Sequence, residues 1–299
     1  MMDAHQTYEY DFDLDGNRSA SRVARLVGSG KRVLELGCGP GSQSRVFSEK
    51  LSCNVVGVEI DPERAERAKA YCRKVLVADL ERSDIRELVA PEQFDVVVCA
   101  DVLEHLRAPE SLLSKIKDLI SPGGYLVASV PNITHASIVY EMIHGRFEYR
   151  NEGLLDATHI KFFSHESLLR LFEDAGFCIS EIQRVRSKPQ NTEFKTTAIS
   201  AEDRALLMEI SRRNRDSETY QFVIKAYPLG DCASDNHPTL ALSDEVLRLR
   251  QLTEEYEAEL NRLRSQSQWQ DRPISARIAD KLRRIFKKHG RPSESSAHQ

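Results

Sequence analysis

The sequence has few features of a disulfide-stabilised or membrane-spanning protein. Its six cysteines form no Cys-x-x-Cys pair and are scattered over positions 38, 53, 72, 99, 178 and 232. Three of them fall in apolar, strand-like runs, which indicates buried free thiols rather than disulfides or zinc ligands. No apolar run approaches the roughly 18 residues that a transmembrane helix needs, and residues 1–15 are acidic and aromatic, unlike a signal peptide. We therefore expect a cytoplasmic protein.

An excess of positive charge is also absent. The 42 Lys and Arg residues are outnumbered by 46 Asp and Glu residues, which gives a net charge of -4. This balance argues against a nucleic-acid partner. The chain of 299 residues, 40% of them hydrophobic, has room for one α/β domain of about 200–230 residues and for an appendage.

The most informative stretch is residues 33–41, which read Val-Leu-Glu-Leu-Gly-Cys-Gly-Pro-Gly. The apolar residues predict a buried parallel strand, and three glycines within five residues predict a turn that passes close to a ligand. A phosphate-binding loop would continue with Lys-Ser or Lys-Thr, and a dinucleotide fingerprint would space its glycines differently. The carboxylate of Glu35 would repel a pyrophosphate and suits a ligand with an ammonium or sulfonium charge. An ordinary tight turn is the alternative.

Strand-like and helix-like segments alternate along the first half of the chain. We expect helices at 17–27, 41–51, from Pro62 and 109–120, and strands at 31–36, 55–59, 75–77, 94–100 and 125–130. This alternation predicts a parallel sheet with helices on both faces, whose ligands bind at the carboxyl ends of the strands. Residues 121–124, Ser-Pro-Gly-Gly, predict a stop before the fifth strand. Strands at 177–186 and 219–227 would complete the sheet, the second inserted antiparallel beside the first.

Two stretches of the sequence resemble a known family. Glu35 with the spacing Gly37-x-Gly39-x-Gly41 resembles motif I of the class I S-adenosylmethionine-dependent methyltransferases, and residues 57–61, Gly-Val-Glu-Ile-Asp, resemble their second motif. The resemblance covers about residues 8–228. It implies a doubly wound, Rossmann-like α/β fold with a seven-stranded methyltransferase sheet. It also implies that the residues binding S-adenosyl-L-methionine are Glu35, Gly37, Cys38, Gly39, Gly41, Glu59, Asp79, Leu80, Ala100 and Asp101.

The same resemblance suggests what each acid does. Glu35 would orient the methionine ammonium group, Glu59 would accept both ribose hydroxyls, and Asp79 would accept from the adenine amino group. Asp101 would lie beside the methionine portion. Asp61 is a rival of Glu59, although its position before Pro62 is more typical of a helix cap. Each acid taken alone could equally be a solvated loop residue, so the prediction depends on their shared location at successive strand ends.

Two histidines are candidates for the general base at the methyl acceptor. The segment 101–106, Asp-Val-Leu-Glu-His-Leu, resembles the one after strand four in ubiquinone-type O-methyltransferases and directs His105 into the cleft. An imidazole, with an ordinary pKa of about 6.5, can take a hydroxyl proton as the methyl group transfers. A structural His105 that caps a turn or bridges to Glu104 is the alternative.

The second histidine lies in residues 156–163, Asp-Ala-Thr-His-Ile-Lys-Phe-Phe. This stretch resembles one in bacterial methyltransferases that modify surface sugars. His159 would be the base or a substrate ligand, Asp156 would fix its tautomer, and helix capping is the alternative. Asn132 and His135 would be further substrate contacts. We see no metal triad with convincing spacing, so we expect catalysis by proximity and a general base, with no metal.

The chain changes in composition after the predicted domain. We divide it into an N-terminal segment with a helix, a methyltransferase domain, a linker, a short coiled coil, a basic amphipathic helix and a disordered tail, at residues 1–30, 31–228, 229–239, 240–265, 270–290 and 291–299. The coiled coil would pair two copies of the chain or bind a partner. The basic helix predicts peripheral contact with the cytoplasmic face of a membrane, and docking on a protein is the alternative.

These observations lead to one main prediction and two alternatives. The chain is expected to be an S-adenosylmethionine-dependent methyltransferase that O-methylates a sugar or glycan intermediate, lipid-linked or free, in cell-surface polysaccharide biosynthesis. The first alternative is an O-methyltransferase of a quinone precursor or small aromatic, although the predicted coiled coil argues against it. The second is a non-catalytic, cofactor-binding scaffold in a glycan-assembly complex.

Overall fold

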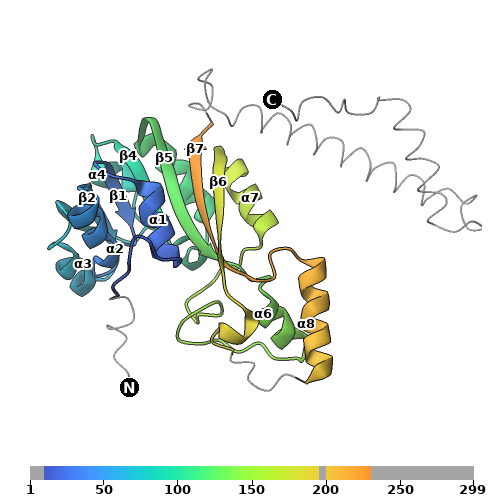
Figure 1. The fold of residues 1–299 in the computed structure, drawn as a ribbon. Helices are drawn as coiled ribbons and strands as arrows, with labels where there is room; N and C mark the ends of the chain where they lie inside the picture. Colours follow the sequence, from blue (N-terminus) through green and yellow to red (C-terminus); the bar gives the residue numbers. More distant parts are fainter. Residues whose placement is uncertain (1–9, 195–199, 230–299) are drawn as a thin grey trace, which may run out of the picture. The chain divides into compact units, whose positions relative to one another are not determined.

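The computed structural model describes residues 10–194 and 200–229. They form a seven-stranded sheet with the order β3-β2-β1-β4-β5-β7-β6 (Figure 1). The strands are β1 (Arg32–Leu36), β2 (Asn54–Glu59), β3 (Lys74–Val77), β4 (Phe94–Ala100), β5 (Ile120–Pro131), β6 (Phe177–Arg186) and β7 (Thr219–Pro228). The first five strands are parallel, and β7 runs antiparallel between β5 and β6. The predicted doubly wound α/β sheet is confirmed, including the inserted antiparallel strand.

Eight α-helices accompany these strands in the described part of the chain. They are α1 (Ser19–Val27), α2 (Ser42–Arg45), α3 (Pro62–Ala68), α4 (Ile85–Val89), α5 (Pro109–Ile116), α6 (Ala136–Ile143), α7 (His165–Asp174) and α8 (Ala201–Arg213). The helices expected at 17–27, 41–51, from Pro62 and at 109–120 are present as α1, α2, α3 and α5. Serine caps at positions 164 and 200 also predict α7 and α8, whereas α4 and α6 were not predicted. Helix α2 continues as a π-helical turn at Val46–Lys50, and a 3₁₀ turn at Leu103–His105 follows β4.

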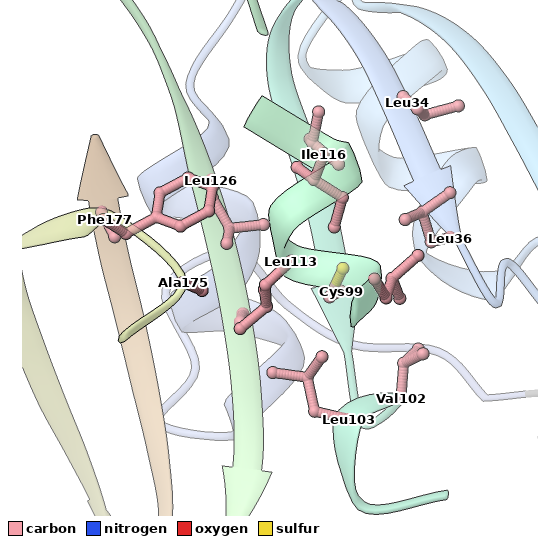
Figure 2. Close-up of a cluster of buried hydrophobic side chains, with 14 of the residues drawn as sticks. Leu34, Leu36, Cys99, Val102, Leu103, Leu113, Ile116, Leu126, Ala175 and Phe177 are labelled. Carbon is pink, nitrogen blue, oxygen red and sulfur yellow. The ribbon is translucent and has the colours of Figure 1, made fainter. Parts of the chain in front are cut away.

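The sheet is buried on both faces. Successive residues of a strand point to opposite faces, so the apolar residues of one strand enter two different hydrophobic clusters. Leu34 and Leu36 of β1 belong to one hydrophobic cluster, whereas Val33 belongs to another. Figure 2 shows the first cluster, in which Leu113 and Ile116 of α5 lie over the sheet. This packing fixes the carboxyl end of β1, from which the glycine-rich turn departs.

The predicted stop at residues 121–124 is wrong. These residues lie within β5, which begins at Ile120. The pairing of β4 with β5 passes from Phe94–Ile120 to Val96–Tyr125, so the extra residues form a bulge. Two glycines make the bulge possible: Gly123 has a φ of 76°, and a Cβ on Gly124 would lie 2.8 Å from the Asp95 carbonyl oxygen.

A smaller hydrophobic cluster forms after β5. It contains Ile138 of α6, Leu154, Leu155 and Phe194. Figure 1 shows α6 and α8 next to each other, away from the main body of the sheet. A backbone bridge between Asn132 and Phe163 joins this region to the end of β5. It brings residues 156–163 close to the carboxyl edge of the sheet.

The predicted linker, coiled coil, basic helix and tail lie outside the described residues, apart from Leu229. Among residues 10–194 and 200–229, no helix is both long and apolar enough to cross a bilayer.

Candidate active site

The glycine-rich turn after β1 is fixed to the end of β2. The backbone N–H groups of Gly37 and Cys38 both donate to the Val58 carbonyl, at 2.8 and 3.0 Å. Gly37 has a φ of 68°, and a Cβ there would lie 2.8 Å from Cγ2 of Val102. The turn therefore requires glycine at this position for both its conformation and its space.

The second acid is tied to the same turn. Oε2 of Glu59 accepts the Gly39 N–H at 2.8 Å, and Oε1 accepts the Asp61 N–H at 3.0 Å. The Asp61 carboxylate in turn accepts the N–H groups of Glu63 and Arg64 at the start of α3, at 2.8 and 3.2 Å. Asp61 is thus the helix cap that its position before Pro62 predicted, which leaves Glu59 for a ligand.

A single cavity of about 500 Å³ brings the predicted cofactor residues together. All of them line it except Gly41. Gly41 has a φ of 92°, and a Cβ there would lie 3.0 Å from Cα of Ala68 and Cδ2 of Tyr71. This glycine lets the turn pack against the end of α3, which corrects its predicted role in ligand binding.

Further lining residues were not among the individual residues predicted from the sequence. They are Tyr10, Pro40, Ser42, Gln43, Val58, Ile60, Arg64, Ala78, Glu81, Val102, Leu106 and Thr158. Tyr10 precedes the first helix and is held by a hydrogen bond from its N–H to Oγ of Ser42, at 3.1 Å. Ile60 follows Glu59 and is 63% exposed, so it offers an apolar surface that a ligand can cover.

Glu35 suits a cationic ligand. It lines the cavity, is only 3% exposed, and accepts a hydrogen bond from the hydroxyl of Ser44. Burial raises its pKa to about 8, against the lowering effect of the Ser44 hydroxyl. A buried carboxyl of this kind ionises readily only when a positive charge lies beside it. The ammonium and sulfonium of S-adenosylmethionine supply that charge, so the residues present fit this cofactor.

Asp79 lines the same cavity as Glu35. Oδ1 of Asp79 accepts the Glu81 N–H at 2.9 Å, and its Oδ2 lies 3.4 Å from Nε of Arg82. Leu80 and Ile60 line the cavity next to this carboxylate. An acceptor beside apolar walls is consistent with an adenine site.

Asp101 is held in an unusual conformation at the end of β4. Its φ is 55°, which is rare for a residue with a side chain and is found where the surroundings enforce it. Oδ1 accepts from the Ser129 hydroxyl at 2.7 Å and from Nε2 of Gln221 at 3.0 Å. Strands β5 and β7 therefore fix this carboxylate at the cavity wall.

The fold brings the two candidate histidines into contact. The backbone carbonyl of Glu104 accepts the N–H groups of Ile160 and Lys161 at 2.9 and 3.0 Å. These bonds hold residue 159 beside residue 105. The imidazole centroids of His105 and His159 are 4.9 Å apart, and the rings meet at 68°.

The partners of His105 define its tautomer. Its Nδ1 lies 3.2 Å from both the carbonyl oxygen and Oγ1 of Thr158. Because the Thr158 hydroxyl donates its proton to Oδ1 of Asp156 at 2.6 Å, Oγ1 can only accept from His105. Nδ1 therefore carries the proton, and Nε2 has a free lone pair. His105 also lines the cavity.

His159 is buried behind His105. Its Nδ1 lies 3.3 Å from the Leu154 carbonyl, an acceptor, so this nitrogen also carries the proton. Burial and the neighbouring His105 lower the pKa of His159. Asp156 accepts from the N–H of Thr158 at 2.8 Å and from its hydroxyl, rather than from His159. The prediction that Asp156 fixes the His159 tautomer is therefore wrong, because the carboxylate closes a tight turn onto Thr158 and acts on His105 instead.

Glu104 completes this group. It is 1% exposed, and neither carboxylate oxygen has a hydrogen-bond partner among the described residues. Burial raises its pKa well above the ordinary value, and the nearby Asp101 carboxylate adds to the shift. One ligand atom each from Glu104, His105 and His159 lie within 4.8 Å of one another. Residue spacing did not predict this triad because His159 is distant from the other two residues along the chain.

Asn132 and His135, predicted as substrate contacts, form hydrogen bonds to backbone groups instead. Nδ2 of Asn132 donates to the carbonyls of Asp216 and Thr219 at 2.9 and 2.8 Å. Nδ1 of His135 caps α6 by accepting the N–H of Ser137 at 3.2 Å. Both side chains are fully buried.

Comparison with known proteins gives a consistent result. Residues 10–182 match a family described as a methyltransferase domain. The chain is 28% identical over 169 residues to the ubiquinone biosynthesis O-methyltransferase of Aeromonas salmonicida, covering 56% of this chain and 71% of that protein. It is 29% identical over 176 residues to the enzyme of the same name from Psychrobacter arcticus, covering 56% and 67%.

A solved structure shares the fold. The crystal structure of a SAM-dependent methyltransferase from Archaeoglobus fulgidus has a TM-score of 0.50 and 22% sequence identity, and the match covers 69% of this chain and 91% of that one.

Proposed function

Because the chain belongs to the methyltransferase-domain family and is an S-adenosylmethionine-dependent methyltransferase, we propose that it methylates a hydroxyl oxygen of an aromatic acceptor, of the kind found in quinone precursors. The observation that carries this proposal is that His105 lines the cofactor cavity and carries its lone pair on Nε2. This lone pair is suited to act on a hydroxyl group beside the cofactor.

Different residues of the chain would bind different parts of the cofactor. S-adenosylmethionine, when bound, supplies a methyl group on a positively charged sulfur. Glu35 would hold the cationic portion, Glu59 the ribose hydroxyls and Asp79 the adenine amino group. Holding the acceptor oxygen in line with the methyl group provides most of the acceleration. Activation of the hydroxyl at His105 adds a factor of about 10²–10⁴.

The aromatic class of acceptor has two sources of support. The relatives named above are ubiquinone biosynthesis O-methyltransferases. In addition, a row of aromatic side chains leads away from His159. Phe162 lies 6.4 Å from His159 and 6.2 Å from Phe147, and Phe147 lies 5.6 Å from Tyr149 between ring centroids. Phe147 is 44% and Tyr149 56% exposed, so an acceptor with an apolar body can lie against them.

The glycan acceptor, the main prediction from the sequence, receives no support from these relatives. The predicted tail on which it partly depended lies outside the described residues. A sugar acceptor is therefore the competing outcome of the test that follows.

The test is a comparison of acceptors with the purified full chain. S-adenosylhomocysteine formation is measured with catechol, 3,4-dihydroxybenzoate, free sugars, nucleotide sugars and lipid-linked sugars at equal concentration. We expect turnover with the two catechols, and His105→Ala to lower kcat by about 10²-fold or more while binding of S-adenosylmethionine is retained. Turnover with sugars alone would overturn the acceptor class. Turnover with none of them, including lipid-linked sugars, would favour the non-catalytic alternative.

A further inference from the structure

We infer that Cys38 and Cys72 form a redox-modification site, at which a peroxide converts two free thiols into one disulfide within the chain and thereby weakens the binding of S-adenosylmethionine. Both cysteines are free in this structure. The inference concerns the cofactor half of the site, so it is independent of the proposed acceptor.

The two sulfur atoms lie beside the same point of β2. A Cβ on Gly57 would lie 2.7 Å from Sγ of Cys38 and 3.3 Å from Sγ of Cys72. The two thiols also form a side-chain hydrogen bond with each other. A side chain at residue 57 would occupy this space, so glycine leaves room for the two sulfur atoms to approach.

Both cysteines lie in connections rather than in helices or strands. Cys38 belongs to the glycine-rich turn after β1, and Cys72 lies between the end of α3 and the start of β3. The two connections pack together, since a Cβ on Gly41 would lie 3.0 Å from Cα of Ala68 and from Cδ2 of Tyr71. A disulfide requires its two Cβ atoms to be about 3.5–4.5 Å apart. Connecting segments adjust to such a requirement more readily than paired strands do.

Cys72 is the nucleophile of the pair. The hydrogen bond from Cys38 lowers the pKa of Cys72 against the effect of burial, and the Ser44 hydroxyl adds to the lowering. The same hydrogen bond, together with burial, raises the pKa of Cys38, so Cys38 keeps its proton. Cys72 is also partly exposed. A thiolate that solvent can reach is the form of cysteine that reacts with peroxides.

The reaction is a two-electron oxidation of the two thiols by hydrogen peroxide. The Cys72 thiolate attacks one peroxide oxygen, so a sulfur–oxygen bond forms and the oxygen–oxygen bond breaks. The other oxygen leaves as hydroxide and takes a proton from solvent to become water. The Cys38 sulfur then attacks the sulfenic acid of Cys72, a sulfur–sulfur bond forms, and the sulfur–oxygen bond breaks. The second oxygen leaves as water with the proton of Cys38.

The disulfide would disturb cofactor binding at two places. Cys38 lines the cavity and precedes Gly39, whose N–H donates to Glu59, so a bridge that displaces Cys38 moves this turn. The second place is the Ser44 hydroxyl, which donates to Glu35 and also interacts with the other thiol of the pair. Oxidation removes that thiol as a hydrogen-bonding partner. Both carboxylates are residues that would bind the cofactor.

Peptide mapping and calorimetry test the site on the full chain. The reduced chain is treated with hydrogen peroxide, quenched with N-ethylmaleimide and digested with trypsin without reductant. We expect a species that joins residues 33–45 to residues 70–73, the tryptic peptides of the two cysteines. The oxidised chain should bind S-adenosylmethionine about 5-fold or more weakly, and dithiothreitol should reverse both changes. No joined species, or a joined species with unchanged affinity, overturns the inference.

Two serine variants separate this pair from oxidation elsewhere. Cys72→Ser should form no joined species and should keep its cofactor affinity after peroxide treatment. Cys178→Ser, which removes another partly exposed free cysteine, should respond to peroxide like the wild type. If peroxide weakens binding equally in Cys72→Ser, the effect belongs to another residue and the inference is wrong.

A measurement on the wild type decides the matter if Cys72→Ser fails to fold. Because coupling between two binding or modification equilibria is reciprocal, saturating S-adenosylmethionine should shift the equilibrium in a dithiothreitol buffer toward the two thiols by the same factor. An unchanged equilibrium would contradict the coupling. Neither assay contains an acceptor, so failure here leaves the proposed acceptor class untouched, and failure of catechol methylation leaves this site untouched.

Discussion

The imidazole rings of His105 and His159 meet edge to face, with centroids 4.9 Å apart, although α5, β5 and α6 separate the two residues in the chain. Each ring donates its Nδ1 proton to a backbone carbonyl. The pair therefore presents two unprotonated nitrogens next to the buried carboxylate of Glu104. We propose that this arrangement forms the centre of the acceptor site and that the surrounding residues orient it.

Binding of S-adenosylmethionine should strengthen as the pH rises from 6 to 8. The pKa of Glu35, raised to about 8 by burial, keeps this group mainly protonated below pH 8 when no ligand is bound. A cationic ligand favours the ionised form, so binding releases a proton and the affinity increases with pH up to about 8. Calorimetry at several pH values measures the effect.

The control for this prediction is Glu35→Gln, which cannot ionise. It should bind the cofactor more weakly than the wild type at pH 8, and its affinity should no longer increase between pH 6 and 8. An equally steep rise in the variant would assign the titration to another group, such as the ligand's own amine.

Thr158→Val should lower kcat without weakening cofactor binding. The hydroxyl of Thr158 connects Asp156 to His105, and its loss leaves only the Thr158 carbonyl to orient the imidazole. We expect kcat to fall by about 10-fold, KM for S-adenosylmethionine to stay unchanged, and Thr158→Ser to restore the rate.

The control is Thr192→Val. The Thr192 hydroxyl also donates a hydrogen bond, to the Pro189 carbonyl at 2.8 Å, but Thr192 is buried, whereas Thr158 is exposed, and it does not line the cavity. Should both valine variants lose the same fraction of kcat, the effect of Thr158 would be one of stability rather than of His105 orientation.

Gly37→Ala and Gly39→Ala should separate stability from binding. At Gly37 a Cβ would collide with Val102 at 2.8 Å in a backbone with a φ of 68°, so we expect a loss of about 2–4 kcal/mol in the free energy of unfolding. At Gly39 a Cβ meets nothing within 4 Å. The loss there should be about 1 kcal/mol, from the positive φ alone, while cofactor affinity falls because Gly39 lines the cavity. Thermal unfolding and calorimetry measure both quantities, and equal destabilisation would contradict the role of Val102.

Asn132→Ala should destabilise the protein without changing its chemistry. The side chain donates hydrogen bonds to the carbonyls of Asp216 and Thr219. Without it these buried acceptors lose a partner, which should lower the free energy of unfolding by about 2–3 kcal/mol. Denaturant unfolding measures this cost. The folded variant should keep the wild-type KM for acceptor, and a specific rise in that KM would restore Asn132 as a substrate contact.

The cofactor half of the site could be predicted from the sequence because its residues stand at the ends of consecutive strands. Glu35 and Glu59 follow runs of apolar residues that can only be buried strands, and parallel strands bring their carboxyl ends to one edge. The glycine spacing then specified how closely the backbone approaches a ligand. The role of Gly41 differs from the predicted one. A side chain at this position is excluded by packing against Ala68 and not by the approach of a ligand.

The acceptor half could be predicted only in part. His105 and residues 156–163 were found by resemblance, but their contact depends on the Glu104 carbonyl, which binds backbone groups far along the chain. No spacing rule predicts such a long-range contact. Tyr10 and Gln221 reach the site from the two ends of the domain, and neither belongs to a local pattern. The bulge in β5 was missed because a Pro-Gly-Gly run predicts a turn equally well.

The most direct test of the account is the fate of a labelled methyl group. The full chain is incubated with S-adenosylmethionine carrying a deuterated methyl group and with 3,4-dihydroxybenzoate, and the products are identified by mass spectrometry and NMR. The account predicts one labelled methyl group on a ring oxygen, and its loss in His105→Ala. A labelled methyl group on carbon, or none on this acceptor when a sugar is labelled under the same conditions, would contradict it.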